Sequence, residues 1–144
     1  MITDEQTREI ALFFLFSLLD QRVALQAAHK AIAQVKALPT DEGVISKSDI
    51  ARILKRGFET HRKLLPRNQP IEISETALSM PEGTDFATWQ KFHVAASDHE
   101  ITAVVLAKIL GYDEEVLADG FQVSVGTMKY RISKGMRQLG SVVK

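Results

Sequence analysis

The sequence predicts an all-α chain: two small helical domains joined by a proline-containing linker, the second domain being a three-helix helix-turn-helix unit. Apolar residues recur at helical spacing along most of the 144 residues, a pattern typical of helices that pack on a core. Three of the four prolines stand together in the middle of the chain, where they separate two groups of helices. We therefore expect a domain over residues 1–66, a linker with one helix over 67–96 and a second domain over 97–144.

The first two helices are predicted from their caps and apolar residues. Thr3 and Gln6 have the spacing of a capping box, so a helix should run from there to about Leu19. Apolar side chains cover most of its circumference, and we therefore expect it to be central and nearly buried. A second helix is expected over residues 20–38, because Pro39 cannot continue it.

A third helix is predicted from an N-cap at Ser48 to about Leu65. Its apolar residues share one face and its cations lie mostly outward, so it should present a basic surface. The cations that we expect to contact DNA there are Arg52, Lys55, Arg56 and Arg62.

The predicted linker covers residues 66–81, and a helix is expected after it over residues 85–96. This helix carries Trp89, the single tryptophan of the chain. A buried indole usually serves packing, so we expect Trp89 to dock the helix on one of the two domains.

Two short helices are predicted at the start of the C-terminal unit. Ser97 and Glu100 match a capping box before the apolar run 101–110, and Gly111 should end that helix. Asp113 can cap the next helix. Its inward residues are expected to be Val116, Leu117 and Phe121.

The last helix is basic and carries the strongest functional signal. Ser124 is a favourable N-cap, and no acidic residue occurs from 121 to 144. The apolar stripe predicted to face the core consists of Val125, Met128, Ile132, Met136 and Leu139.

A short helix, a tight turn and a basic helix are the layout of a helix-turn-helix, whose second helix lies in the DNA major groove. We expect base or phosphate contacts from Thr127, Tyr130, Arg131 and Lys134, and flanking phosphate contacts from Lys129 and Arg137. The alternative is an ordinary surface helix with a solvated basic face.

The net charge is zero, but the charges are divided along the chain. Residues 43–70 hold seven basic and two acidic residues, and residues 121–144 hold five and none, whereas 71–120 hold two basic and ten acidic residues. Local fields rather than the total attract phosphate, so two basic elements on an acidic connector fit a two-point DNA contact. Alternatively, the acidic middle neutralises the basic ends by packing against them.

The C-terminal run resembles the promoter-reading domain of small bacterial sigma factors of the extracytoplasmic-function type. The matching residues are Glu114-Glu115, Leu117-Ala118, Val123-Ser124-Val125-Gly126-Thr127-Met128-Lys129, Arg131-Ile132 and Leu139. Autoinducer-type response regulators share much of the Ser-x-Gly-Thr-x-Lys pattern. Gln122 stands where a turn glycine is frequent, and Gly120 is expected to supply that flexibility instead.

Residues 7–66 resemble the N-terminal domain of the same family in the order and length of the helices. The resemblance implies that the second helix grips RNA polymerase and that the third reads and opens the promoter. Here the second helix has no carboxylate or aromatic residue over 25–32, and Phe58 is the only aromatic residue of the third. Strand opening needs side chains that stack on bases, so a degenerate sigma-like protein is a second possibility.

The sequence therefore predicts a cytoplasmic DNA-binding transcription regulator, with double-stranded promoter DNA, RNA polymerase core and an anti-sigma factor as candidate partners. The alternatives are a sigma mimic that sequesters an anti-sigma factor and a conventional dimeric helix-turn-helix regulator. We expect no membrane span, because the apolar run 10–19 is too short. The absence of cysteine, the scattered histidines and the lack of a phosphate loop or nucleophile motif predict no enzyme, cofactor or metal.

Overall fold

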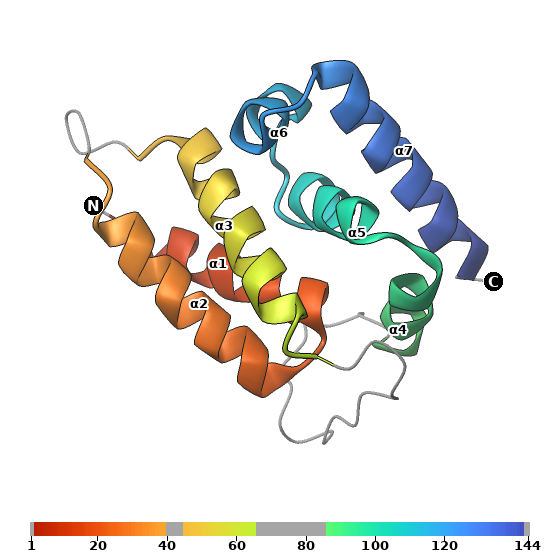
Figure 1. Ribbon diagram of the computed structural model, residues 1–144, viewed down its shortest axis with the longest axis horizontal. Helices are drawn as coiled ribbons and strands as arrows, with labels where there is room; N and C mark the ends of the chain where they lie inside the picture. Colours follow the sequence, from red (N-terminus) through yellow and green to blue (C-terminus); the bar gives the residue numbers. More distant parts are fainter. Residues whose placement is uncertain (1, 40–44, 66–85, 143–144) are drawn as a thin grey trace.

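The computed structural model describes residues 2–39, 45–65 and 86–142, and every regular element in them is helical (Figure 1), as predicted. In chain order the elements are α1 (Asp4–Leu18), α2 (Gln21–Lys36), α3 (Lys47–Arg62), α4 (Phe86–Ala95), α5 (Asp98–Val104), the π-helix η1 (Val105–Ile109), α6 (Glu114–Phe121) and α7 (Val125–Val142). The predicted linker, residues 66–81, lies outside the described residues. None of the helices described has the length and apolar character needed to cross a membrane.

Local capping sets where α1 and α2 begin. The Thr3 hydroxyl accepts from the Gln6 amide, and the Gln6 side chain accepts from the Thr3 amide, both at 3.0 Å, so the predicted capping box is confirmed. Asp20 caps α2 by accepting from the Val23 amide at 3.0 Å.

The prediction that Ser48 caps α3 is wrong. The extended residue before the helix is Ser46, whose side chain makes no cap hydrogen bond, and Ser48 lies in the first turn. Both serines suit a cap by composition, and the backbone geometry selects the earlier one.

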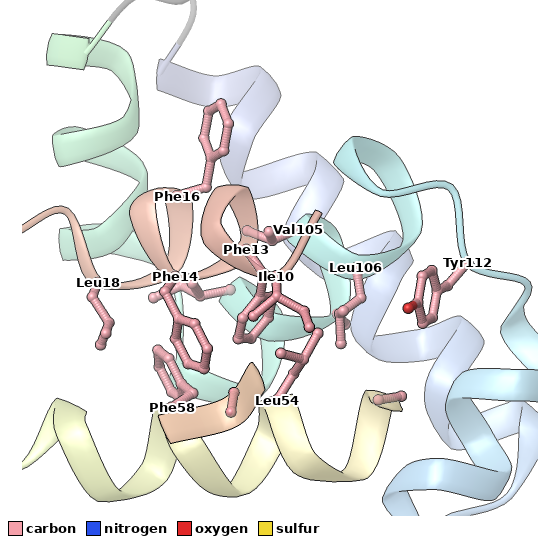
Figure 2. Close-up of a cluster of buried hydrophobic side chains, with 14 of the residues drawn as sticks. Ile10, Phe13, Phe14, Phe16, Leu18, Leu54, Phe58, Val105, Leu106 and Tyr112 are labelled. Atoms are coloured by element: carbon pink, nitrogen blue, oxygen red, sulfur yellow. The ribbon is translucent and has the colours of Figure 1, made fainter. Parts of the chain in front are cut away.

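The helices of the two halves of the chain share one hydrophobic core. Helices α1, α2 and α3 pack on one another, α5 and α6 each pack on α7, and α6 also packs on α3 (Figure 1). Figure 2 shows Leu54 and Phe58 of α3 converging with Ile10 of α1 and Leu106 of η1, and these four side chains are at most 2% exposed. The division into domains at residues 66 and 97 stays a prediction, but packing joins the two halves directly.

Helix α4 bridges the end of α1 and the side of α7 (Figure 1). Trp89 is 8% exposed and packs edge-on against Phe16 and Phe92, with ring centroids 4.8 and 5.5 Å apart, which confirms its packing role. The Nε2–H of His93 donates to the Phe16 carbonyl at 2.8 Å. Since the last carbonyls of a helix lack partners within it, this bond completes the C-terminal turn of α1.

The predicted helix over 101–110 is divided. Its first part is α5, with the Ser97–Glu100 capping box as predicted, and its second part widens into η1. Gly111 then adopts φ 74°, a left-handed conformation that glycine takes without strain and that ends the helix as predicted.

Candidate nucleic-acid interface

Helix α7 starts at a fully formed cap. The Ser124 hydroxyl accepts from the Thr127 amide at 3.0 Å and donates to the Thr127 hydroxyl at 2.9 Å. The predicted N-cap is confirmed, and the Thr127 side chain is held at the N-terminus of the helix. Anionic groups are favoured there by the free amides and the helix dipole.

The inner face of α7 is narrower than predicted. Met128 and Ile132 are 0% and 6% exposed, but Val125 and Met136, also predicted to face the core, are 38% and 36% exposed. The buried position that the prediction missed is Gly135. A Cβ there would lie 3.1 Å from the Glu100 carbonyl oxygen and would clash with a methyl group of Val104, so α7 lies almost against the backbone of α5.

The opposite face of α7 carries most of the predicted contact residues. Tyr130 is 57% exposed. The other exposed residues there are Thr127, Lys129 and Arg137, while Arg131 and Lys134 are half-buried at the side of the helix. The arrangement places hydroxyls, an aromatic ring and cations on one rigid surface, which suits contact with phosphates and base edges.

Two of the α7 cations already have carboxylate partners. Lys134 Nζ lies 3.6 Å from Glu100 Oε2, and Lys129 Nζ lies 3.9 Å from Glu114 Oε2. The Glu100 side chain is 8% exposed and also accepts from the Ser97 hydroxyl at 2.7 Å. Through these two pairs, Glu100 and Glu114 offset part of the positive charge of α7.

The turn between α6 and α7 is made by Gln122 rather than by the glycine expected there. Gln122 adopts the left-handed conformation, with φ 58°. Gly120, expected to supply the flexibility, instead lies within α6 and is buried against α3: a Cβ there would be 2.7 Å from the Ser48 carbonyl oxygen. That expectation is wrong because the missing side chain serves helix packing rather than turn geometry.

The basic residues of α3 mostly do not project freely into solvent. Arg62 Nε is 3.4 Å from Asp98 of α5, and its side chain is only 12% exposed. Lys55 lies 3.8 Å from Glu59, with its Nζ 5.6 Å from the centre of the Phe121 ring.

Arg52 is ion-paired with Asp49 at 2.8 Å, and its side chain is 33% exposed. Of the four predicted α3 contacts, Arg56 is exposed and the other three are half-buried. The expectation that these cations lie outward is wrong for Arg62. Helical periodicity predicts which residues share a face of the helix, but not whether that face contacts solvent or another helix.

The chain was compared with known protein families, curated proteins and solved structures, and only solved structures match it. No protein-family model matches the chain, and no curated protein matches it. One similar solved structure is that of the sigma factor RpoE in complex with the anti-sigma factor NepR from Bartonella quintana. It aligns over 95% of this chain and 91% of that chain, with a TM-score of 0.73 and 16% sequence identity. The chain therefore has the fold of a sigma factor.

Proposed function

We propose that this chain is a sigma-factor-like transcription regulator that reads double-stranded promoter DNA through the outward face of α7. The main observation that supports the proposal is the structure of α7. It is an 18-residue helix with a formed N-cap, a tightly packed inner face and an outer face of hydroxyls and cations without any carboxylate. The likeness of the whole chain to RpoE supports the same class of function.

The ion pairs of α7 do not prevent phosphate contact. The pair between Lys129 and Glu114 is long, at 3.9 Å, and both side chains are substantially exposed. Exposed pairs of this kind contribute about 0–1 kcal/mol, so a phosphate can replace the carboxylate at little cost. Lys134 is different: Glu100 is nearly buried, so Lys134 also holds α7 against α5.

Arg131→Ala is expected to weaken specific duplex binding by roughly 1–3 kcal/mol if the guanidinium reads a base. Arg131 lies next to Tyr130, half-buried at the side of α7, and an arginine side chain is long enough to hydrogen-bond a base edge in the major groove. The measurement is fluorescence anisotropy on a duplex selected by the protein from a random pool, repeated over a range of salt concentrations.

The matched control for this measurement is Arg22→Ala, which removes an exposed cation from α2, away from α7 (Figure 1). It should leave the affinity unchanged. An Arg131→Ala variant with both the affinity and the salt dependence of the unaltered protein would show that Arg131 does not touch DNA.

A second candidate function is binding to a protein of the transcription machinery. The RpoE structure is a complex with the anti-sigma factor NepR, and it matches nearly the whole length of this chain. An anti-sigma factor is therefore a candidate partner here, as is RNA polymerase core. Helix α2 offers a suitable surface, since its exposed face carries Arg22 and Lys30 and the helix contains no carboxylate.

A pull-down with tagged protein separates these functions. Retention of polymerase core that is lost in an Arg22→Glu/Lys30→Glu variant supports a sigma factor that docks through α2. Duplex binding without core retention supports a conventional regulator. Binding of neither, together with capture of a purified anti-sigma factor, supports a sigma mimic.

A further inference from the structure

Three cations of α3 contact the C-terminal half along one side of the helix. Lys47, Lys55 and Arg62 are eight and seven residues apart, which places them within about 80° around the helix axis. We call their contacts with the C-terminal half the seam. Its members are Lys47 Nζ, 5.7 Å from the centre of the Tyr112 ring; Lys55 Nζ, 5.6 Å from that of Phe121; and Arg62, paired with Asp98 at 3.4 Å.

The groups that meet these cations are suited to hold them. Burial raises the pKa of Tyr112 to about 12, with the charge of Glu9 adding to the effect, so the ring under Lys47 stays a neutral phenol. A cation over an aromatic face is attracted by the negative charge density of the ring, more strongly where water is excluded. The seam thus uses α3 cations as structural contacts.

The backbones of α3 and α6 touch between these cations. A Cβ on Gly120 would lie 2.7 Å from the Ser48 carbonyl oxygen and 3.0 Å from the Ala51 Cβ. Real Cβ atoms are not found that close to a backbone oxygen. Only glycine therefore allows α6 to approach α3 this closely. Such close packing is typical of a protein interior rather than of a loose contact between two domains.

Beneath the seam the hydrophobic core passes from one half to the other without a polar boundary. Leu54 of α3 and Leu106 of η1 are both 0% exposed and lie in the same cluster as Ile10 of α1 (Figure 2). Domain interfaces that open readily are more polar than this, and relative motion is the expectation only where the interface is not large and hydrophobic. Duplex DNA offers phosphates and polar base edges, none of which can cover the apolar surface that opening would expose.

From these contacts we infer that the two halves form one cooperative body, and that Lys47, Lys55 and Arg62 hold it closed rather than contact phosphate. The chain then presents a single DNA-binding face, centred on α7, in place of a two-point contact through α3 and α7. This last consequence rests on the proposed function. The inference of a single cooperative body does not, because it follows from packing alone.

The first test is equilibrium unfolding of the full chain in urea, followed by the fluorescence of Trp89 and by far-ultraviolet circular dichroism. If the two halves form one cooperative body, the unfolding transitions seen by the two probes should coincide.

The variant Arg62→Met should move both midpoints together to lower urea. The variant Leu106→Ala, on the C-terminal side, should move the Trp89 fluorescence transition as far as the dichroism transition. Arg56→Met, the exposed control on the same helix, should leave them in place. Separate transitions, or a Leu106→Ala shift seen by dichroism alone, would overturn the inference.

The second test is the dependence of duplex affinity on salt. Each phosphate contact removed lowers the slope of log affinity against log salt by about one. We expect that loss for Arg137→Met on α7 and no loss for Lys55→Met or Arg62→Met. A slope lowered by either seam variant would show that α3 contacts DNA, and would refute both the purely structural role of these cations and the single DNA-binding face. If the unaltered chain binds no duplex, the proposed function fails, whereas the unfolding test still decides whether the halves are one body.

Discussion

Gly135→Ala is expected to destabilise the protein by about 1–3 kcal/mol, the cost typical of forcing extra atoms into a packed site. In the interior of a helix the same change ordinarily stabilises, because alanine loses less backbone entropy than glycine on folding. Here the added Cβ would meet the Glu100 carbonyl oxygen at 3.1 Å and a methyl group of Val104. Neither is the end of a flexible side chain, so α7 would have to move away from α5.

Gly140 provides a matched control in the same helix. A Cβ there would meet nothing within 4 Å, so Gly140→Ala should stabilise by roughly 0.5–1 kcal/mol. Urea unfolding of both variants measures the two effects, which are expected to have opposite signs. A Gly135→Ala protein as stable as the Gly140→Ala protein would mean that α7 does not lie against α5 as described.

The second large effect is a loss of stability as the pH falls from about 6.5 to about 4. Burial lowers the pKa of His93 from 6.5 to about 4; the nearby charge of Arg62 lowers it too, while the bond to the Phe16 carbonyl acts in the opposite direction. The unfolded chain therefore binds a proton in this range of pH that the folded protein does not. Protonation favours the unfolded state there, and a shift of this size corresponds to about 3 kcal/mol once the pH is below 4.

Urea unfolding between pH 7.5 and pH 4.0 measures this loss. His93→Gln should flatten the dependence, because an amide can donate to the Phe16 carbonyl but does not titrate. His29→Gln is the control, since His29 is exposed on α2 and its replacement should leave the acid sensitivity intact. If the His93→Gln protein loses stability as steeply as the unaltered one, some other group is responsible.

Both effects concern the parts of the molecule that position α7. Gly135 sets how closely α7 approaches α5, and His93 joins α4, which packs on α7, to the end of α1. A change at either position is therefore expected to reach the candidate DNA surface through the orientation of α7. Stability measurements should accompany every DNA-binding measurement on such variants.

The caps show what could be predicted from the sequence. The capping box at Thr3 and the cap at Ser124 depend on residues no more than three positions apart, so their spacing alone identifies them. The prediction of Ser48 as the N-cap of α3 is wrong. Ser46, two residues earlier, is an equally suitable cap by residue type, and only the backbone geometry distinguishes the two.

The glycines and the α3 cations show what could not be predicted. Positions 120 and 135 require glycine because a neighbouring helix packs too closely for a side chain. No pattern of nearby residues indicates which helix that neighbour is. The spacing of Ile132, Gly135 and Leu139 does follow the helical period, so Gly135 could have been placed on the inner face. The side chain of Arg62 looked outward on an isolated helix, yet it meets Asp98, thirty-six residues further along.

Short-range patterns in the sequence predict the helical character of the described residues, the first residues of most helices and the basic face of the last helix. These properties follow from hydrogen bonds and apolar periodicity within a few residues. The packing of the helices establishes that Glu100 and Glu114 are paired with α7, and that three α3 cations face the C-terminal half. Which charge lies opposite which depends on how the helices pack, and that packing is set by apolar contacts and close glycine approaches between residues far apart in the chain.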